Sequence, residues 1–281
     1  MTGRGGDKPD DLDVLALRER LVAPNGPYAA LDVVGTTGST NADLLAAARE
    51  GAADRTVLIA DAQTAGRGRR DRTWVSPSGT GLYLSVLLRP SAVPADRLGT
   101  LGMVAGLALM HVATEAGVTA SLKWPNDLMI AGAKCAGVLS EAVPDGAAQA
   151  AVVGIGLNVA PMPETVPAGP GGLAATCLGD HGATTTDRGT LAIGFLGAFL
   201  ELEHTWRVAD GDVERSGVLT GYRESCGTLG QRVRAELPGG STRVGVAVDV
   251  DAGGRLLIKM DDGVVSALSA GDVVHLNPED V

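Results

Sequence analysis

The spacing of apolar and polar positions along the chain predicts a mixture of helices and strands. Residues 56–60 and 82–88 are continuous apolar runs of strand length, and residues 94–117 form an apolar stretch long enough for a buried helix. Further strands are expected at residues 121–123, 135–141 and 151–158, and further helices at residues 12–21, 42–49 and 188–208. Because strands and helices do not alternate strictly, we predict an α+β fold with a central mixed or antiparallel sheet flanked by helices.

The pattern of apolar and turn-forming residues changes near residue 228. Short β-like runs follow, and they are separated by turn signals at residues 238–240, 252–254, 261–263 and 270–272. This spacing is typical of a small SH3-like β-barrel. We therefore expect a flexible N-terminal segment at residues 1–27, a large domain at 28–227 and a small SH3-like domain at 228–281.

The chain is acidic, with a formal net charge of −10 at pH 7. A protein that coats nucleic acid normally presents a strongly basic face, so this charge argues against that class and against a nucleic-acid partner. Cys135, Cys177 and Cys226 lie far apart, and the four histidines are scattered. Neither pattern suggests a disulfide framework, a zinc site or a histidine-based nucleophile.

The chain carries no targeting or membrane-spanning signal. The first residues contain no apolar core of a signal peptide. The longest apolar stretch, residues 98–110, is too short and too interrupted by glycine to span a bilayer, so it is better interpreted as a buried helix. Together with the unpaired cysteines, this predicts a protein of the cytoplasm that does not associate with membranes.

A run of arginines and glycines at residues 66–72 is the most prominent local signal. Arg67, Arg69, Arg70 and Arg72 lie within six positions of a strongly acidic protein. Glycines allow backbone N–H groups to approach a ligand, and guanidinium groups offer paired donors to carboxylates and phosphates. The run therefore indicates an anion-binding loop, although a solvated basic turn or an RNA-binding arginine–glycine patch would have the same composition.

A second signal is the sequence Lys-Trp-Pro-Asn-Asp at residues 123–127, followed by Lys134. An aspartate beside phosphates commonly holds magnesium, and a lysine neutralises charge that develops on a reacting centre. The simpler alternative is a turn between two strands, with Trp124 in the core and the charged groups in water.

Two further segments could bind a ligand or could be purely structural. Gly154 and Gly156 would leave room for a flat ligand on a strand, but they would equally suit a buried strand beside another backbone. The run lacks the third glycine and the helix of a dinucleotide fingerprint, so it does not indicate a Rossmann fold. Residues 39–41 could bind a polar heterocycle or could simply cap a helix.

Taken in chain order, these segments resemble biotin protein ligases, also called biotin–acetyl-CoA-carboxylase ligases. The matching pieces are Ser-Thr-Asn at 39–41, Gln63, Gly-Arg-Gly-Arg-Arg at 66–70, Trp74, Lys-Trp-Pro-Asn-Asp at 123–127, Lys134 with 136–139, Gly-Ile-Gly-Leu-Asn at 154–158, and Ala-Gly-Asp-Val at 270–273. The likeness extends over residues 31–276. Five motifs in family order are specific, even though none of them is decisive alone.

The resemblance implies a class II synthetase-like ligase domain and a two-step reaction. Biotin would be activated with ATP to biotinyl-5′-AMP, pyrophosphate would leave, and biotin would then pass to a lysine of the biotin carboxyl carrier domain of an acyl-CoA carboxylase. Magnesium would accompany ATP. The enzyme would be a monomer or a weak homodimer.

The resemblance also implies roles for individual residues. The biotin-binding set would be Ser39, Thr40, Asn41, Gln63, Gly66, Arg67, Gly68, Arg69, Trp74, Lys134, Gly137, Gly154 and Gly156. The ATP-binding set would be Arg69, Arg70, Lys123, Asn126, Lys134 and Asn158, with Asp127 holding magnesium. Lys134, Arg67 and Arg69 would be catalytic, and the arginines would order over the acyl-phosphate.

The sequence departs from the family pattern at two places. Asp71 stands where the family often has glycine, which puts the closing geometry of the arginine loop in question. The short N-terminal segment does not resemble the winged helix-turn-helix of relatives that repress transcription, so we expect a ligase without operator binding. A lipoate–protein ligase and a non-catalytic nucleic-acid-binding module are the alternative functions.

Overall fold

Apolar runs that the sequence marks as strands form the centre of a seven-stranded sheet. The computed structural model describes residues 12–143, 149–161, 168–237, 241–269 and 271–276. The strands of this sheet are β1 (Ala30–Thr37), β2 (Thr56–Gln63), β3 (Gly81–Leu88), β4 (Ser121–Lys123), β5 (Asp127–Ile130), β6 (Ala133–Val143) and β7 (Ala150–Asn158). Their order is β1-β2-β3-β7-β6-β5-β4. Only β1 and β2 pair in parallel, so the sheet is mixed.

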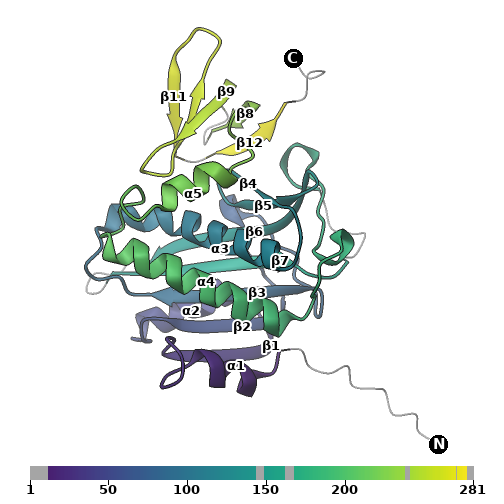
Figure 1. Ribbon diagram of the computed structural model, residues 1–281, viewed down its shortest axis with the longest axis vertical. Helices are drawn as coiled ribbons and strands as arrows, with labels where there is room; N and C mark the ends of the chain where they lie inside the picture. Colours follow the sequence, from purple (N-terminus) through teal and green to yellow (C-terminus); the bar gives the residue numbers. More distant parts are fainter. Residues whose placement is uncertain (1–11, 144–148, 162–167, 238–240, 270, 277–281) are drawn as a thin grey trace, which may run out of the picture.

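Helices cover both faces of this sheet. The helices are α1 (Val14–Leu21), α2 (Thr40–Arg49), α3 (Leu101–Glu115), α4 (Arg188–Val208) and α5 (Val218–Ser225), and the short 3-10 helices are η1 (Arg69–Asp71), η2 (Ala95–Thr100), η3 (Pro170–Gly172) and η4 (Gly179–His181). Helices α3 and α4 lie against each other in front of the sheet in Figure 1, and α2 lies behind it. A small second apolar cluster beneath α2 contains Leu44, Leu87 and Val152.

The C-terminal part forms a separate five-stranded antiparallel sheet. Its strands are β8 (Arg232–Glu236), β9 (Thr242–Val250), β10 (Leu256–Lys259), β11 (Val265–Leu268) and β12 (Asp272–His275), in the order β11-β10-β9-β8-β12. It lies at the upper end of the molecule in Figure 1, next to α5. Its buried side chains, such as Val233 and Ile258, continue the same apolar cluster as the first sheet. The prediction of a mixed sheet flanked by helices, with a small C-terminal β domain, is confirmed.

The helix expected at residues 12–21 is present as α1, whereas the expectation of a flexible N-terminal segment is wrong for its described part. Residues 1–27 were expected to be flexible; the first eleven lie outside the described residues, but the rest is folded. Asp13 caps α1 by accepting hydrogen bonds from the backbone of Leu15 and Ala16. Leu17 and Leu21 are buried in the main core. The helix is stable because two apolar residues one turn apart reach the core, a signal that is weak in so short a segment.

Strands β1 and β5 and helix α5 were not predicted. Strand β1 is half exposed and carries mixed residues, so its sequence lacks a continuous apolar run. The predicted helix at 94–117 is η2 followed by α3, and nine residues of α3 are buried. Among the described residues, one helical stretch, Ala95–Glu115, is long and apolar enough to cross a membrane; it is 61% buried here, as expected for a core helix.

Candidate active site

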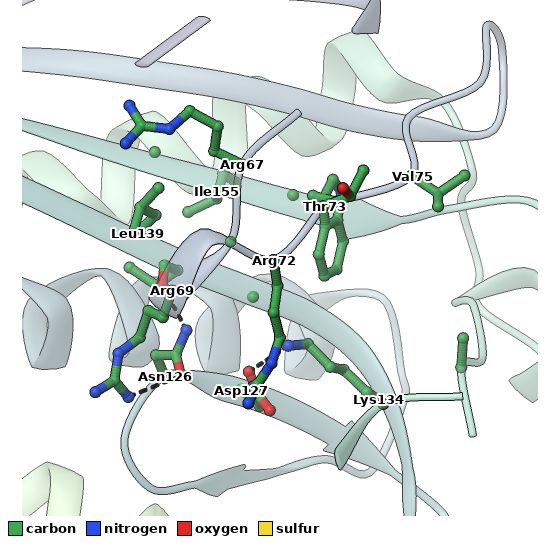
Figure 2. A pocket seen from close by; sticks show the side chains of 18 of the residues that line it. Arg67, Arg69, Arg72, Thr73, Val75, Asn126, Asp127, Lys134, Leu139 and Ile155 are labelled. Atoms are coloured by element: carbon green, nitrogen blue, oxygen red, sulfur yellow. Dashed lines mark hydrogen bonds and ion pairs between the residues drawn. The ribbon is translucent and has the colours of Figure 1, made fainter. Parts of the chain in front are cut away.

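A pocket opens on the α2 face of the seven-stranded sheet, at the N-terminal end of that helix. One wall is formed by β6 and β7, and the arginine loop (residues 64–76) covers part of the opening. Figure 2 shows that Arg67, Arg69 and Arg72 leave this loop in different directions. The pocket is also lined by the 123–127 turn and by residues 272–273 at the start of β12. Two domains that are distant in sequence therefore contribute to one site.

One end of the pocket is a network of uncharged polar groups. The backbone N–H and hydroxyl of Thr40 lie 3.0 and 3.2 Å from Gln63 Oε1, and Gln63 donates to Ser76 Oγ. Ser85, which is fully buried on β3, donates to Asn41 Oδ1 at 2.6 Å and lies 2.7 Å from Thr40 Oγ1. Ser39 also caps α2. Ser39 therefore both caps the helix and lines the pocket, beside Thr40 and Asn41.

Glycines on the pocket wall accommodate two protein side chains. A Cβ on Gly154 would lie 1.9 Å from Asn41 Oδ1, and a Cβ on Gly156 would lie 2.3 Å from Trp74 Nε1. A Cβ on Gly137 would lie 3.2 Å from the Trp74 ring. These glycines thus make room for Asn41 and the Trp74 indole. They also line the pocket, so their contact with a flat ligand stays a prediction.

Arg67 lies at the uncharged end of the pocket. Its Nη1 atom is 3.1 Å from Glu141 Oε1, and Asn41 Nδ2 donates to Glu141 Oε2 at 2.9 Å. Glu141 is near the end of β6, seven residues after Lys134. The Lys134 ammonium lies beside Gly137, 3.3 Å from a Cβ built there. Gly137 is four residues before Glu141, which is about 13 Å along a strand, so Arg67 and Lys134 lie toward different ends of the pocket.

Cationic groups gather at the other end. Lys134 Nζ is 2.6 Å from Asp127 Oδ1 and 5.3 Å from the centroid of the Trp74 ring. Burial lowers the pKa of Lys123 and the pKa of Arg69 below their ordinary values, while the nearby Asp127 carboxylate opposes this shift in both groups. The carboxylate therefore offsets only part of the free-energy cost of removing these two cations from water. An anionic ligand at this end would complete the compensation.

The arginine loop closes on itself through backbone hydrogen bonds. Trp74 N donates to Gly66 O at 2.8 Å, and Gly68 N donates to Arg72 O at 2.7 Å. Arg70 and Asp71 have φ values of 56° and 59°. Aspartate is one of the few residues other than glycine that tolerate this left-handed conformation. Asp71 therefore adopts a conformation that glycine would also favour, and the loop keeps its closed geometry.

Most residues singled out from the sequence line this one pocket. They are Ser39, Thr40, Asn41, Gln63, Arg67, Gly68, Arg69, Trp74, Lys123, Asn126, Asp127, Lys134, Gly137, Gly154, Gly156 and Asn158. Asn126 donates to Val138 O at 2.7 Å, and Asn158 donates to Thr176 O at 2.9 Å. The side-chain amides of both residues are therefore held in place by backbone oxygens.

Two of the singled-out residues do not line the pocket. Gly66 is a buried residue of the loop itself, and a Cβ there would be 2.4 Å from Trp74 O. Its lack of a side chain lets the two arms of the loop approach each other. Arg70 turns away and pairs with Asp272 at 2.6 Å. Because Asp272 itself lines the pocket, contact of Arg70 with ATP stays a prediction. Arg72, part of the predicted anion-binding run, also lines the pocket. Two carboxylates were missed because they are far from this run in sequence: Asp272, which lines the pocket, and Glu141, which pairs with Arg67.

The donor set at the cationic end suits magnesium only together with a phosphate ligand. Among the described residues, no group of three His, Cys, Asp or Glu side chains is placed to hold a metal ion. Magnesium in nucleotide sites usually needs only one or two protein carboxylates besides phosphate oxygens and water. Asp127 supplies one carboxylate in the pocket, so the residues present fit a metal ion that arrives with a nucleotide.

Comparisons with known proteins agree with this architecture. Residues 37–158 match the biotin/lipoate A/B protein ligase family, and residues 228–276 match the biotin protein ligase C-terminal domain. The chain is 42% identical to the biotin–[acetyl-CoA-carboxylase] ligase of Mycobacterium tuberculosis over 98% of this chain and 100% of that protein. It is 32% identical to the bifunctional ligase/repressor BirA of Bacillus subtilis, over 85% of this chain and 71% of that protein.

Solved structures give the same result. A biotin protein ligase from Aquifex aeolicus, in complex with biotin and ATP, is 27% identical and superposes with a TM-score of 0.69, covering 88% of this chain and 98% of that one. A biotin protein ligase from Leishmania major, in complex with biotin, is 25% identical with a TM-score of 0.58, covering 87% and 99%. The chain therefore belongs to the biotin protein ligase family.

Proposed function

We propose that the chain is a biotin–[acetyl-CoA-carboxylase] ligase. It converts biotin and ATP into biotinyl-5′-AMP and pyrophosphate, and then transfers biotin to a lysine of the biotin carboxyl carrier domain of a carboxylase. The observation that carries this proposal is the pocket itself, which joins an uncharged polar end to a cationic end. Such a site suits a ligand with a neutral polar ring at one end and a carboxylate beside a nucleotide at the other.

The polar end would bind the ureido ring of biotin. Ser39, Thr40 and Gln63 offer hydroxyl, backbone and amide groups at fixed positions, and the Trp74 indole offers an apolar wall. Glu141 holds Arg67 at this end of the pocket. Arg67 would therefore contact the ureido ring of biotin, and not the acyl-phosphate as the resemblance implied. Groups held at fixed positions give specificity because they lose little conformational freedom when the ligand binds.

The cationic end would bind the biotin carboxylate and the nucleotide. In the first step a carboxylate oxygen attacks the α-phosphorus, and the bond to pyrophosphate breaks. This step brings two anions together, so it requires fixed positive charge more than a general base. Lys134 and Arg69 supply this charge, and Lys123, Asn126 and Asn158 lie beside them to hold the nucleotide. Magnesium, when bound at Asp127, would neutralise phosphate charge.

The second step requires protection of the intermediate. The lysine amine attacks the carbonyl carbon of the mixed anhydride, AMP leaves, and an amide bond forms. Water could attack the same carbon, so the pocket must exclude it until the acceptor arrives. The arginine loop already lies over the pocket and would order further around biotinyl-AMP. Trypsin should therefore cut this loop more slowly in the presence of biotinyl-AMP; equal cutting in both states would contradict this role.

Biotinylation of an acceptor domain tests the proposal directly. The purified chain is incubated with biotin, ATP, magnesium and a biotin carboxyl carrier domain, and the mass of the acceptor is measured. One biotin per acceptor lysine is expected. The Lys134→Ala variant should lose roughly 100-fold in rate, since one charged contact to a reacting centre is commonly worth about 3 kcal/mol. Failure of the unaltered chain to form biotinyl-AMP at saturating substrates would refute the proposal.

Lipoate is the second candidate substrate because the family match at residues 37–158 covers both biotin and lipoate ligases. The C-terminal match at residues 228–276 favours biotin. Exchange of radiolabelled pyrophosphate into ATP separates the two, because only the true acid substrate supports it. We expect exchange with biotin and none above background with lipoate.

The remaining parts of the proposal concern partners and location. The three cysteines are buried and unpaired, which suits a reducing compartment, and we place the enzyme in the cytoplasm. The proposal includes no nucleic-acid or membrane partner and a monomer or weak homodimer. A specific gel shift with biotin-operon DNA would contradict the first of these points, and sedimentation would measure the oligomeric state.

A further inference from the structure

A single carboxylate from the C-terminal sheet holds two arginines of the arginine loop. Asp272 Oδ2 lies 2.6 Å from Arg70 Nη1, Asp272 Oδ1 lies 2.9 Å from Arg72 Nη1, and Arg72 Nη2 also pairs with Asp272. The Asp272 side chain is 12% exposed. Its two oxygens therefore connect a loop near residue 70 to a strand two hundred residues later.

The position of Asp272 is fixed by its own domain. Asp272 pairs with Glu236 in the register of β12 and β8. The backbone oxygen of the next residue, Val273, accepts a hydrogen bond from Lys123. The start of β12 is thus held to the 123–127 turn as well as to the arginine loop. A rigid anchor can position a mobile partner, whereas two mobile groups cannot.

The tip of the arginine loop has few other anchors. No residue of η1 (Arg69–Asp71) is fully buried, although Arg69 is half-buried. Arg70 Nη1 also lies 3.4 Å from Glu236 O, and Arg67 pairs with Glu141 at 3.1 Å. Arg69 Nη1 is 3.5 Å from Asn126 Oδ1, at the limit of a hydrogen bond. The backbone hydrogen bonds described above join the loop to itself. Segments with few buried apolar contacts open at low energetic cost. The ion pairs with Asp272 therefore contribute much of the free energy that keeps the loop closed.

We propose that Asp272 is a positioning residue that keeps the arginine loop closed and so prevents premature loss of the adenylate. This inference rests on the proposed function. Without the clamp, water would reach the mixed anhydride: its oxygen would bond to the acyl carbon, and the acyl–phosphate C–O bond would break. AMP would leave with the electron pair, and the proton would pass to solvent. The C-terminal domain would thereby couple ATP use to protein biotinylation.

The simple electrostatic alternative makes the opposite prediction. A carboxylate that lines a nucleotide pocket repels phosphates, so removing its charge should by itself favour ATP. If Asp272 acted only through this repulsion, Asp272→Asn would lower KM for ATP and leave the coupling intact. If Asp272 positions the loop, the same variant would release AMP by hydrolysis of biotinyl-AMP without biotinylating the acceptor.

The decisive measurement is the number of AMP molecules released per acceptor lysine biotinylated. We expect a ratio near one for the unaltered chain, and Asp272→Asn should raise it roughly three- to tenfold, since charged hydrogen bonds at partly exposed sites are modest. Hydroxylamine should trap more biotinyl hydroxamate in the same variant. Asp272→Glu, which keeps the charge, should restore part of the coupling. A ratio that stays near one in Asp272→Asn overturns the inference.

A matched control lies in the same domain. Asp261 pairs with Arg232 at 2.9 and 2.7 Å but does not contact the pocket. Asp261→Asn removes the same charge from a turn of the same domain, between β10 and β11, and its AMP ratio should equal that of the unaltered chain. An equal rise in both variants would mean that general destabilisation of the domain is responsible, and this would overturn the specific role of Asp272.

A second readout does not depend on the reaction. Trypsin cleavage after Arg69, Arg70 and Arg72, mapped by mass spectrometry without ligands, should be several times faster in Asp272→Asn than in Asp261→Asn. Equal rates would overturn the clamp. If the unaltered chain made no biotinyl-AMP, the proposed function would fail, yet this cleavage experiment would still decide whether Asp272 holds the loop.

Discussion

At the scale of single residues, the absence of a side chain shapes the pocket wall. Gly156 lies beneath the Trp74 indole, and a Cβ there would be 2.3 Å from Nε1. Gly156→Ala should displace the indole and raise the biotin KM, with a roughly ten- to hundredfold loss in kcat/KM because small misplacements in a site are costly. Steady-state kinetics of pyrophosphate exchange at varied biotin concentrations measure this effect.

A glycine outside the pocket provides the control for this prediction. Gly102 is in α3, and nothing lies within 4 Å of a Cβ built there. Gly102→Ala should leave kcat/KM unchanged and raise the free energy of unfolding by up to about 1 kcal/mol, because alanine favours the helix. If Gly156→Ala showed the same unaltered kinetics, the indole would not depend on the space over Gly156.

At the scale of elements, a buried ionic network fixes α4 to the residues that lead into β2. Glu203 is fully buried, with Oε2 3.0 Å from Arg55 Nη2 and Oε1 2.5 Å from Arg207. Arg207 also pairs with Asp54 at 2.8 Å. Glu203→Ala leaves two cations without their shared partner and should lower the free energy of unfolding by about 3 kcal/mol. Urea denaturation measures this loss.

The control for Glu203 lies half a turn away in the same helix. Glu201 is exposed, so Glu201→Ala should change the free energy of unfolding by less than about 0.5 kcal/mol. A loss at Glu203 no larger than that at Glu201 would show that the buried network contributes nothing net, as some buried ion pairs do.

At the scale of the whole molecule, one threonine connects the two sheets. Thr228 Oγ1 accepts a hydrogen bond from Trp124 N at 3.0 Å and lies 3.1 Å from His275 Nε2. Burial, with the Lys123 charge as a second cause, lowers the pKa of His275 from 6.5 to about 4. The unfolded chain therefore binds a proton between these pH values while the folded chain does not, so stability must fall as the pH falls through this window.

The size and origin of this pH effect can be tested with one variant. The His275 contribution is fully present above pH 6.5 and is lost by about pH 4. Since the ring is partly exposed, we expect a loss of about 1–2 kcal/mol in this window. His275→Gln keeps a hydrogen-bonding group but cannot titrate, so urea denaturation should show a shallower pH dependence between pH 7 and pH 4.5. An unchanged slope would assign the effect to other groups.

Local pattern determined the class of fold and most of the chemistry. The apolar runs at residues 56–60, 82–88 and 94–117 predicted buried strands and a core helix. A strand or helix that is buried on all sides carries apolar side chains at nearly every position, and this is visible in the sequence. Strand β1 escaped prediction because it lies at an edge, where three of its eight residues are exposed and one is buried. Trp124 is buried, as the simpler alternative for the 123–127 turn predicted.

The sequence by itself determined which residue types are available: an arginine–glycine loop, a Lys-Trp-Pro-Asn-Asp turn and a strand with two glycines. Only the tertiary structure decided which of them meet. Arg67 forms an ion pair with Glu141, and Arg70 and Arg72 form ion pairs with Asp272. The glycines of β7 face Asn41 and Trp74. The physical reason is that strand periodicity is local, whereas an ion pair depends on distance in space. Asp272 is about two hundred residues from its partners, and only the register of β12 brings its carboxylate to them.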